Sequence, residues 1–361
     1  QWDRGGRGLY FQYDDEGTTR IGHVELDGKV QVLASDVGGL DLGRPYAAGQ
    51  YSVSAASGVF AFTLTSAEHP ADVAVGSRRG GKVRRLTDLN KGLLGHIRLG
   101  SLEEIHFPSG YDKRSIEGWL LKPPGFDPEQ KYPLLLEIHG GPFANYGPRF
   151  SAEDQLYAAA GYVVLYMNPR GSTSYGEAFG NLIHHDYPHH DYDDLMSGVD
   201  AVLKRGFIDP RRLFVTGGSG GGVLTAWIVG HTDRFRAAVV AKPVINWYSW
   251  VLTSDLPSFG TQYWFAGLPW NHLENYMKRS PISYAGNVKT PTMVMTGEVD
   301  YRTPSSDAEQ FYEALKLRKV PAMMIRIPDA NHEIAEKPSN MMAKVAYILG
   351  WFERYGGNKV E

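Results

Sequence analysis

Cysteine is absent from the 361-residue chain, and long apolar runs are missing as well. Without cysteine there is no thiol nucleophile, no disulfide framework and no zinc site built on thiolates. No stretch approaches the roughly 18 consecutive apolar residues that a membrane-spanning helix needs. We therefore expect no membrane segment. The missing cysteine does not fix the compartment, although we favour the cytoplasm over the periplasm or secretion.

A basic excess is also lacking. Lys and Arg number 37 against 40 Asp and Glu, which gives a net charge of -3. Nucleic-acid binders normally gather a surplus of basic residues on one face, so we expect no nucleic-acid partner. The chain starts at Gln1 without a Met or a signal-peptide pattern, and we expect it to be a piece of a longer protein. Composition leaves open whether it forms a homo-oligomer.

Glycine, by contrast, is abundant, with 42 residues, and many of these mark turns between short strands. Strands are expected at residues 8–13, 19–24, 29–33, 59–64 and 82–86. This spacing is typical of a sandwich or of propeller blades, and about ninety residues amount to roughly two blades. Two blades cannot close a propeller, so residues 1–92 are predicted to be the terminal blades of an incomplete β-propeller.

Beyond residue 92 the pattern changes to strands that alternate with helices. Residues 133–138 form a nearly continuous apolar run, as a strand buried on both faces should. Further buried strands are expected at 162–166, 213–216, 237–240, 292–295 and 322–327, with helices at 191–204, 220–229, 305–317 and 339–355. This alternation predicts a parallel, doubly wound α/β sheet over residues 93–361.

A nucleophile elbow is the strongest local motif. Residues 217–221 read Gly-Gly-Ser-Gly-Gly, between a buried-strand pattern and a helical stretch. Small residues around the serine fit the strained strand-to-helix turn of α/β-hydrolases, so Ser219 is the candidate nucleophile. The N–H of Gly220 lies at a helix N-terminus and can stabilise a developing oxyanion. A second donor is expected from Gly140 or Gly141, in the loop after strand 133–138.

The acid and base of such a site follow the serine in chain order, on loops after late strands. His272 and His332 are the histidines that come after the elbow and its helix. His332 follows a predicted strand whereas His272 does not, so His332 is the predicted base. Glu298 and Asp300 compete for the acid, and we prefer Asp300 because it lies deeper in its loop.

Other clusters allow two interpretations each. The histidine-rich stretch 184–191 has no standard metal spacing, so we interpret it as a solvated or helix-capping loop, and we expect neither a metal nor a cofactor. The aromatic segment 246–270 either walls an apolar substrate pocket, with Trp247, Tyr248 and Tyr263, or simply packs the core. Arg302 either binds a substrate carbonyl or carboxylate, or pairs with an acid.

Several of these stretches together resemble the prolyl oligopeptidase family of serine peptidases, in its acylaminoacyl-peptidase branch. The resembling stretches are 139–142, 168–176, 191–195, 217–221, 297–302 and 331–333. The resemblance places Ser219, Asp300 and His332 on the family's triad, and Gly220 and Gly141 on its oxyanion donors. It also implies that the β-rich opening belongs to a propeller. Relatives often have an aromatic residue at the position of Gly220, so this chain departs from their pattern there.

These observations predict a peptidase that acts on short peptides or acyl-peptides, of acylaminoacyl or dipeptidyl type, with an apolar preference on the acyl side. The same site could instead serve a carboxylesterase on small esters, since both reactions pass through an acyl-enzyme. From a different class, the chain could be a catalytically idle scaffold that binds partners through its β module. Labelling by a fluorophosphonate distinguishes an enzyme from a scaffold.

Overall fold

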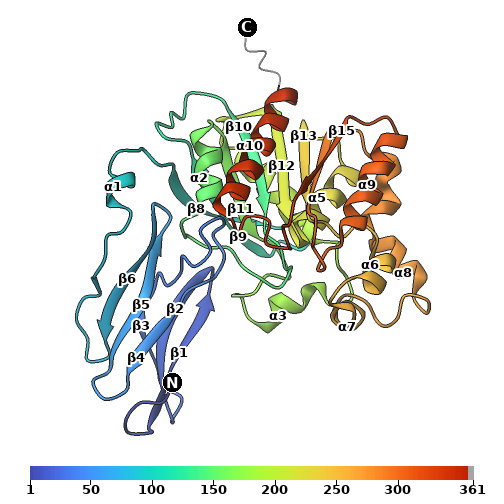
Figure 1. The fold of residues 1–361 in the computed structure, drawn as a ribbon. Helices are drawn as coiled ribbons and strands as arrows, with labels where there is room; N and C mark the ends of the chain where they lie inside the picture. Colours follow the sequence, from blue (N-terminus) through green and yellow to red (C-terminus); the bar gives the residue numbers. More distant parts are fainter. Residues whose placement is uncertain (357–361) are drawn as a thin grey trace.

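The computed structural model describes residues 1–356, and they form a β module that projects from a larger α/β domain (Figure 1). Two separate antiparallel sheets make up the module, and they do not close into a ring. The first sheet contains β1 (Gly8–Asp15), β2 (Thr18–Glu25) and β3 (Val30–Ala34); the second contains β4 (Tyr51–Ser54), β5 (Val59–Ser66), β6 (His69–Ser77) and β7 (Arg84–Arg85).

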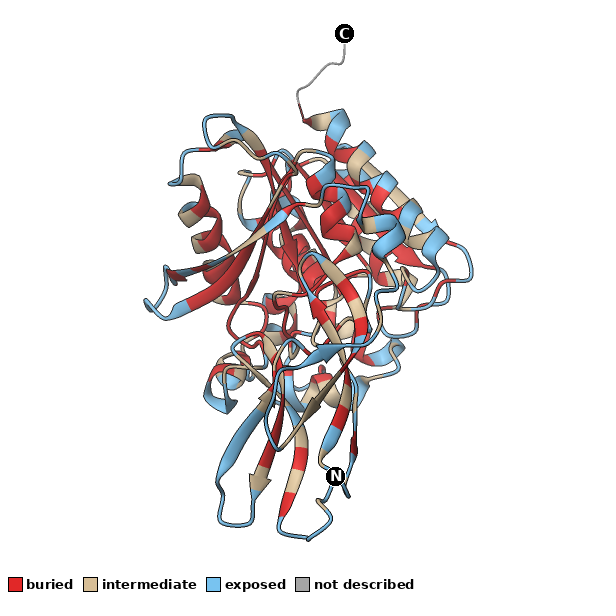
Figure 2. Cartoon of the chain, turned by 90° about the vertical axis from the view of Figure 1, so that its left-hand side faces the viewer, coloured by how far each residue is buried: buried red, intermediate tan, exposed pale blue. Residues whose placement is uncertain are grey.

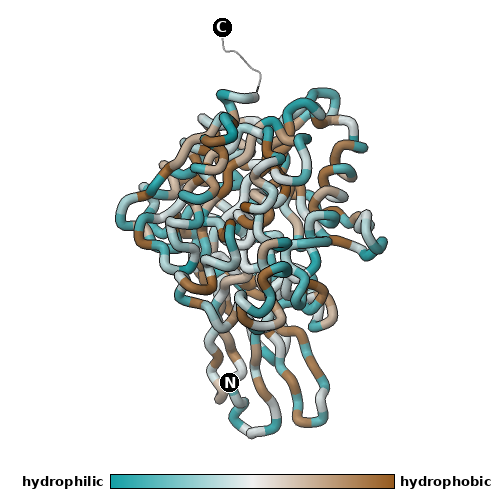
Figure 3. The backbone as a smooth tube through the Cα atoms, turned by 90° about the vertical axis from the view of Figure 1, so that its right-hand side faces the viewer, coloured by the Kyte–Doolittle hydropathy of each residue, from teal (hydrophilic) through white to brown (hydrophobic). Residues whose placement is uncertain are grey.

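Alternating hydrophobic and polar residues allow these strands to bury one face. Along β5, Phe60 and Phe62 are buried whereas Val59 is exposed, as the two-residue period of a strand requires. Figure 3 shows the same alternation of hydropathy along the projecting hairpins. Tyr10 and Ile21 from the first sheet join these phenylalanines in one small core, so the two sheets pack together as a unit.

The α/β domain is built on an eight-stranded sheet in the order β15-β14-β13-β12-β10-β11-β9-β8. Its strands are β8 (Ser101–Pro108), β9 (Ser115–Lys122), β10 (Tyr132–Ile138), β11 (Val163–Asn168), β12 (Ile208–Gly218), β13 (Ala237–Ala241), β14 (Thr292–Gly297) and β15 (Ala322–Ile327). The strands β10 to β15 run parallel, and β9 and β8 add an antiparallel edge. The predicted α/β fold with a large central sheet is confirmed, with this edge as an addition.

Helices cover both faces of the sheet and bury its apolar strands, as the concentration of buried residues in Figure 2 shows. On one face lie α4 (Asp191–Leu203), α5 (Gly220–His231) and α9 (Ser305–Leu317), and on the other α2 (Ala152–Ala159) and α10 (Pro338–Tyr355). Short helices complete the connections: α1 (Lys91–Leu94), α3 (Glu177–Gly180), η1 (Asn181–Ile183) and η3 (Pro281–Asn287). Among residues 1–356, no helix combines the length and the apolar character needed to cross a membrane.

The register of the parallel strands brings their carboxyl ends to the same edge of the sheet. Gly218 pairs with Ala241, and Ala241 pairs with Met295, so β12, β13 and β14 end side by side. Ile138, at the end of β10, pairs with Gly217. The loops that follow these strands therefore meet around Ser219, where ligands bind in open α/β sheets.

An aromatic insertion lies between β13 and β14. It contains α6 (Trp247–Thr253), α7 (Pro257–Phe259), η2 (Gly260–Trp264) and α8 (Leu273–Arg279). Asn246 caps α6 by accepting from the N–H groups of Tyr248 and Ser249. The indole of Trp250 donates to the carbonyl of Arg302 at 2.7 Å, which ties the insertion to the loop after β14.

Candidate active site

Ser219 lies at the sharp turn between β12 and α5, with φ 60° and ψ -121°. A non-glycine residue rarely adopts this conformation, and the turn lifts the hydroxyl above the end of the sheet. The surrounding glycines are required by close approach: a Cβ on Gly221 would lie 2.1 Å from the carbonyl oxygen of Ile138, and a Cβ on Gly217 2.4 Å from the Gly221 oxygen. The glycines therefore allow the close packing of this strand-to-helix turn, with Ser219 at its apex.

His332 and Asp300 come from the loops after β15 and β14, and the structure brings both to Ser219. The Nε2 atom of His332 lies 3.0 Å from Ser219 Oγ, and its Nδ1 atom lies 2.8 Å from Asp300 Oδ2. A carboxylate can only accept, so Nδ1 carries the ring proton and Nε2 is left to accept from the serine hydroxyl. This is the tautomer that a general base needs.

Asp300 is buried, at 3% exposure, and its carboxylate is saturated with donors. Its Oδ1 accepts the N–H groups of Arg302 and Thr303, both at 2.9 Å, while Oδ2 accepts the Thr303 hydroxyl and His332. Burial alone would raise the pKa of Asp300, but the hydrogen bonds and charge of His332 and the Thr303 donors hold it below its usual value. The group is therefore a stable anion beside the imidazole.

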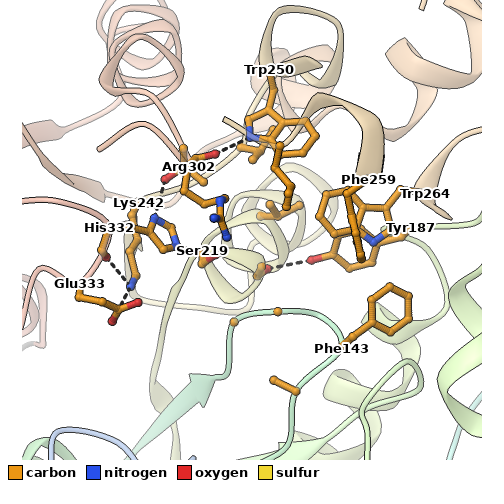
Figure 4. Close-up of a pocket in the computed structure, with 18 of the residues that line it drawn as sticks. Phe143, Tyr187, Ser219, Lys242, Trp250, Phe259, Trp264, Arg302, His332 and Glu333 are labelled. Carbon is orange, nitrogen blue, oxygen red and sulfur yellow. Dashed lines mark hydrogen bonds and ion pairs between the residues drawn. The ribbon is translucent and has the colours of Figure 1, made fainter. Parts of the chain in front are cut away.

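Lys242, directly after β13, contacts the loop that carries His332. Its Nζ donates to the His332 carbonyl at 2.7 Å and lies 3.8 Å from the carboxylate of Glu333 (Figure 4). Burial lowers the pKa of Lys242 to about 8. Sequence reasoning missed this residue, because no motif marks a lysine at a strand end.

Two backbone amides lie beside the serine. The N–H of Gly220 is at the start of α5, where no acceptor exists within the helix. The nitrogen of Gly141 lies 3.1 Å from where a Cβ on Gly220 would stand, and both residues line the cavity that contains Ser219. The N–H of Gly140 instead donates to the hydroxyl of Tyr46. Of the two glycines considered after β10, Gly141 is thus the one placed to offer a donor.

Beyond the serine, a cavity of about 520 Å³ is walled by aromatic side chains. Figure 4 shows His332 on one side of Ser219 and the aromatic wall on the other. The aromatic members are Tyr46, Phe143, Tyr187, Trp247, Trp250, Phe259 and Trp264. The hydroxyl of Tyr187 donates to the Gly220 carbonyl at 3.1 Å, so the wall is attached to the elbow itself.

The predicted substrate residues divide into two groups. Trp247 and Arg302 line the cavity, whereas Tyr248 and Tyr263 are not among its lining residues. Tyr263 is 39% exposed and packs against Phe259, a lining residue, with ring centroids 4.7 Å apart. Tyr248 is half-buried on α6, because helical geometry turns it away from the face that carries its neighbour Trp247. Sequence reasoning missed Phe143 and Tyr187, which lie outside the aromatic segment 246–270, and it did not single out Phe259 within that segment.

Arg302 also has a partner. Its Nε lies 2.7 Å from Asp255 Oδ1, and both side chains are nearly half exposed. Glu298 and His272, the alternatives considered for the acid and the base, lie away from Ser219. Glu298 accepts from the N–H of Asp329 at 3.3 Å, and His272 precedes α8 in the insertion. Neither contacts Ser219 among the hydrogen bonds of residues 1–356.

Comparison with known proteins gives the same family throughout. A model of the prolyl oligopeptidase family matches residues 148–359. The uncharacterized peptidase YuxL of Bacillus subtilis is 36% identical over 98% of this chain and 53% of its own length. Dipeptidyl-peptidase 5 of Porphyromonas gingivalis is 28% identical over 98% of this chain and 51% of its own length. The chain spans about half the length of the curated relatives it matches.

Solved structures agree with this result. The acylaminoacyl peptidase of Pyrococcus horikoshii superposes with a TM-score of 0.86 at 27% identity, over 99% of this chain and 56% of that chain. The similarity extends over the β module as well as the α/β domain, since it covers nearly the whole chain. The family match covers more than half of the 361 residues. The chain therefore belongs to the prolyl oligopeptidase family of serine peptidases.

Proposed function

We propose that this chain hydrolyses short peptides, of acylaminoacyl or dipeptidyl type, through an acyl-enzyme on Ser219. The observation that carries the proposal is the continuous hydrogen-bonded chain from Ser219 Oγ through His332 to Asp300, beside two amides and an aromatic cavity. Two of the similar proteins are named for this substrate class, dipeptidyl-peptidase 5 and acylaminoacyl peptidase.

The chemistry follows from the geometry. Ser219 Oγ attacks the scissile carbonyl carbon while its proton passes to His332 Nε2, and Asp300 stabilises the imidazolium that forms. The carbonyl oxygen becomes an oxyanion that accepts from the N–H groups of Gly141 and Gly220. His332 then returns the proton to the leaving amine as the C–N bond breaks, and water hydrolyses the resulting ester by the same sequence.

An apolar preference on the acyl side follows from the wall of the cavity. The aromatic rings near the serine offer dispersion contacts and hydrophobic burial to a large apolar side chain, whereas a charged one would lose its hydration there. Trp247 contributes to this wall. Arg302, at the rim, can bind a substrate carbonyl or carboxylate while it remains paired with Asp255. Tyr248 and Tyr263 support the insertion from outside the wall. Substrates with an acyl-side Phe or Leu should be cleaved faster than those with Asp or Lys.

We also propose that the chain divides into two domains at residue 92. Residues 93–361 carry the hydrolase, and residues 1–92 are two blades of a β-propeller, in line with two sheets of three and four strands that pack together. Open sheets of this kind repeat around an axis in propellers. The segment between the two sheets lines the cavity with Tyr46 and Ala47, so this part of the module limits the space open to a substrate, which favours short peptides.

Turnover measurements test the proposal. Acetyl-aminoacyl anilides and p-nitrophenyl esters are compared with wild-type protein and Ser219→Ala. We expect anilide cleavage that the substitution abolishes, with loss of fluorophosphonate labelling. Cleavage of the ester but of no anilide or peptide would show a carboxylesterase instead. Absence of both labelling and turnover would favour a scaffold.

A further inference from the structure

The segment between β3 and β4 leaves the β module and lies against the α/β domain beside the candidate site. Its backbone pairs with the loop after β10: the N–H of Gly147 donates to the Pro45 carbonyl at 3.1 Å, and that of Ala47 to the Asn145 carbonyl at 3.3 Å. Tyr46 faces Tyr146 across this pairing, with ring centroids 4.7 Å apart in an edge-on arrangement. The backbone pairing and the ring contact with Tyr146 therefore both hold Tyr46 in place.

The hydroxyl of Tyr46 reaches the glycines next to the serine. It accepts the N–H of Gly140 at 2.5 Å, and it lies 3.1 Å from where a Cβ on Gly140 would stand. The Cβ of Ser219 lies 3.1 Å from the same point. The Tyr46 hydroxyl and Ser219 therefore both lie next to Gly140. Burial raises the pKa of Tyr46 to about 12, so the phenol keeps its proton at neutral pH.

The next peptide unit is held from the other side by His139. Its Nδ1 lies 2.7 Å from the Gly140 carbonyl oxygen, and its Nε2 lies 3.0 Å from the Ser172 hydroxyl. A carbonyl can only accept, so Nδ1 carries the proton and donates to Gly140, while the Ser172 hydroxyl donates to the Pro169 carbonyl at 2.7 Å. The carbonyl of Gly140 and the N–H of Gly141 belong to one planar peptide unit, so this bond orients the Gly141 N–H.

We infer that Tyr46 is a positioning residue of the hydrolase reaction: with His139 it fixes both peptide units of Gly140 and so aims the Gly141 amide at the oxyanion. Glycine has the widest choice of backbone angles, and two consecutive glycines need such external restraint to keep one geometry. The inference rests on the proposed function, and it makes the β module part of the active site.

Tyr46→Phe is the test, because it removes only the hydroxyl. We expect kcat for an acetyl-aminoacyl anilide to fall about tenfold or more, with KM within about twofold, since a misplaced donor weakens transition-state binding rather than substrate binding. Affinity for a peptide boronic acid, whose tetrahedral adduct uses the same amides, should fall by the same factor as kcat/KM. Tyr51→Phe is the matched control, since the Tyr51 hydroxyl donates to the Tyr10 carbonyl within the β module at 3.0 Å.

Hydrogen exchange supplies a readout that is independent of turnover. In Tyr46→Phe the peptide that contains Gly140 should exchange faster, while peptides from α9 and α10 keep their protection. If Tyr46→Phe matches Tyr51→Phe in kcat, in boronic acid affinity and in exchange, the inference is overturned while the proposed function stands. If wild-type protein is not labelled at Ser219 by a fluorophosphonate, the proposed function fails and this inference fails with it.

Discussion

His139 lies between the main sheet and the glycines beside Ser219, at 3% exposure. Burial lowers its pKa to about 4, so the folded protein holds the ring neutral. A neutral ring still donates from Nδ1 to the Gly140 carbonyl, so the contact that orients the Gly141 amide does not need a charged ring.

This neutrality makes stability depend on pH. The unfolded chain binds a proton at His139 below about pH 6.5, whereas the folded chain binds it only near pH 4, so stability falls as the pH is lowered through this window. We expect wild-type protein to lose about 3 kcal/mol more than His139→Gln between pH 7 and pH 4. Denaturant titrations at several pH values measure this difference. Parallel pH curves for the two proteins would contradict the assignment of a neutral, buried ring.

The candidate triad that the structure brings together could be proposed from the sequence because each member follows a buried strand at a position where the fold allows few alternatives. Ser219 carries its glycines with it, and the chain order of acid and base leaves few candidates in each loop. Tyr46 and Lys242 could not be predicted in this way. Each reaches the site through tertiary contacts, with the Gly140 N–H and the His332 carbonyl, and neither contact leaves a local pattern.

The elbow between β12 and α5 depends on glycine for reasons of space. A Cβ on Gly221 would lie 2.1 Å from the Ile138 oxygen, a backbone atom that cannot move alone. We expect Gly221→Ala to lower the free energy of unfolding by about 3 kcal/mol, as severe overpacking does, and to lower activity with it. Thermal and denaturant unfolding measure the effect.

Gly350 on α10 provides the opposite control. A Cβ there meets nothing within 4 Å and the residue is exposed in a helix, so Gly350→Ala should raise stability by up to about 1 kcal/mol. Equal effects of the two substitutions would show that the close approach at the elbow is relaxed in solution.

At the level of elements, the helices and parallel strands were predictable because buried runs and amphipathic periods alternate clearly after residue 92. The antiparallel edge formed by β8 and β9 lacks this alternation, so its pairing with the sheet could not be predicted. The insertion was recognised by its aromatic content. The residues of the insertion that line the cavity were harder to predict. Whether Tyr248 or Trp250 faces the cavity depends on where α6 begins and how it turns.

Across the whole molecule, a buried ionic cluster joins the β module to the sheet. Arg44, from the segment between β3 and β4, lies 3.3 Å from Glu137 on β10 and 3.5 Å from Glu153 on α2. Lys344 on α10 donates to Glu153 at 2.6 and 2.8 Å. Arg44 is the ion-pair partner of Glu137 among the described residues, so this contact connects the two parts of the chain at a charged, buried point.

Removal of that cation should be costly. We expect Arg44→Met to lower the free energy of unfolding by about 3 to 5 kcal/mol, because it leaves the Glu137 carboxylate buried without a partner. The double substitution Arg44→Met with Glu137→Gln should recover part of the loss, since the stranded charge is removed. Denaturant unfolding measures both. An Arg44→Met protein as stable as wild type would contradict a structural role for the cluster.

The proposed reaction depends on Ser219 as the nucleophile that His332 activates. Mass spectrometry of the protein after reaction with a fluorophosphonate, followed by peptide mapping, tests this directly. We predict a single adduct on Ser219, formed in wild-type protein, strongly slowed in His332→Ala and absent in Ser219→Ala. An adduct on another residue, or anilide turnover that survives Ser219→Ala, would contradict the account.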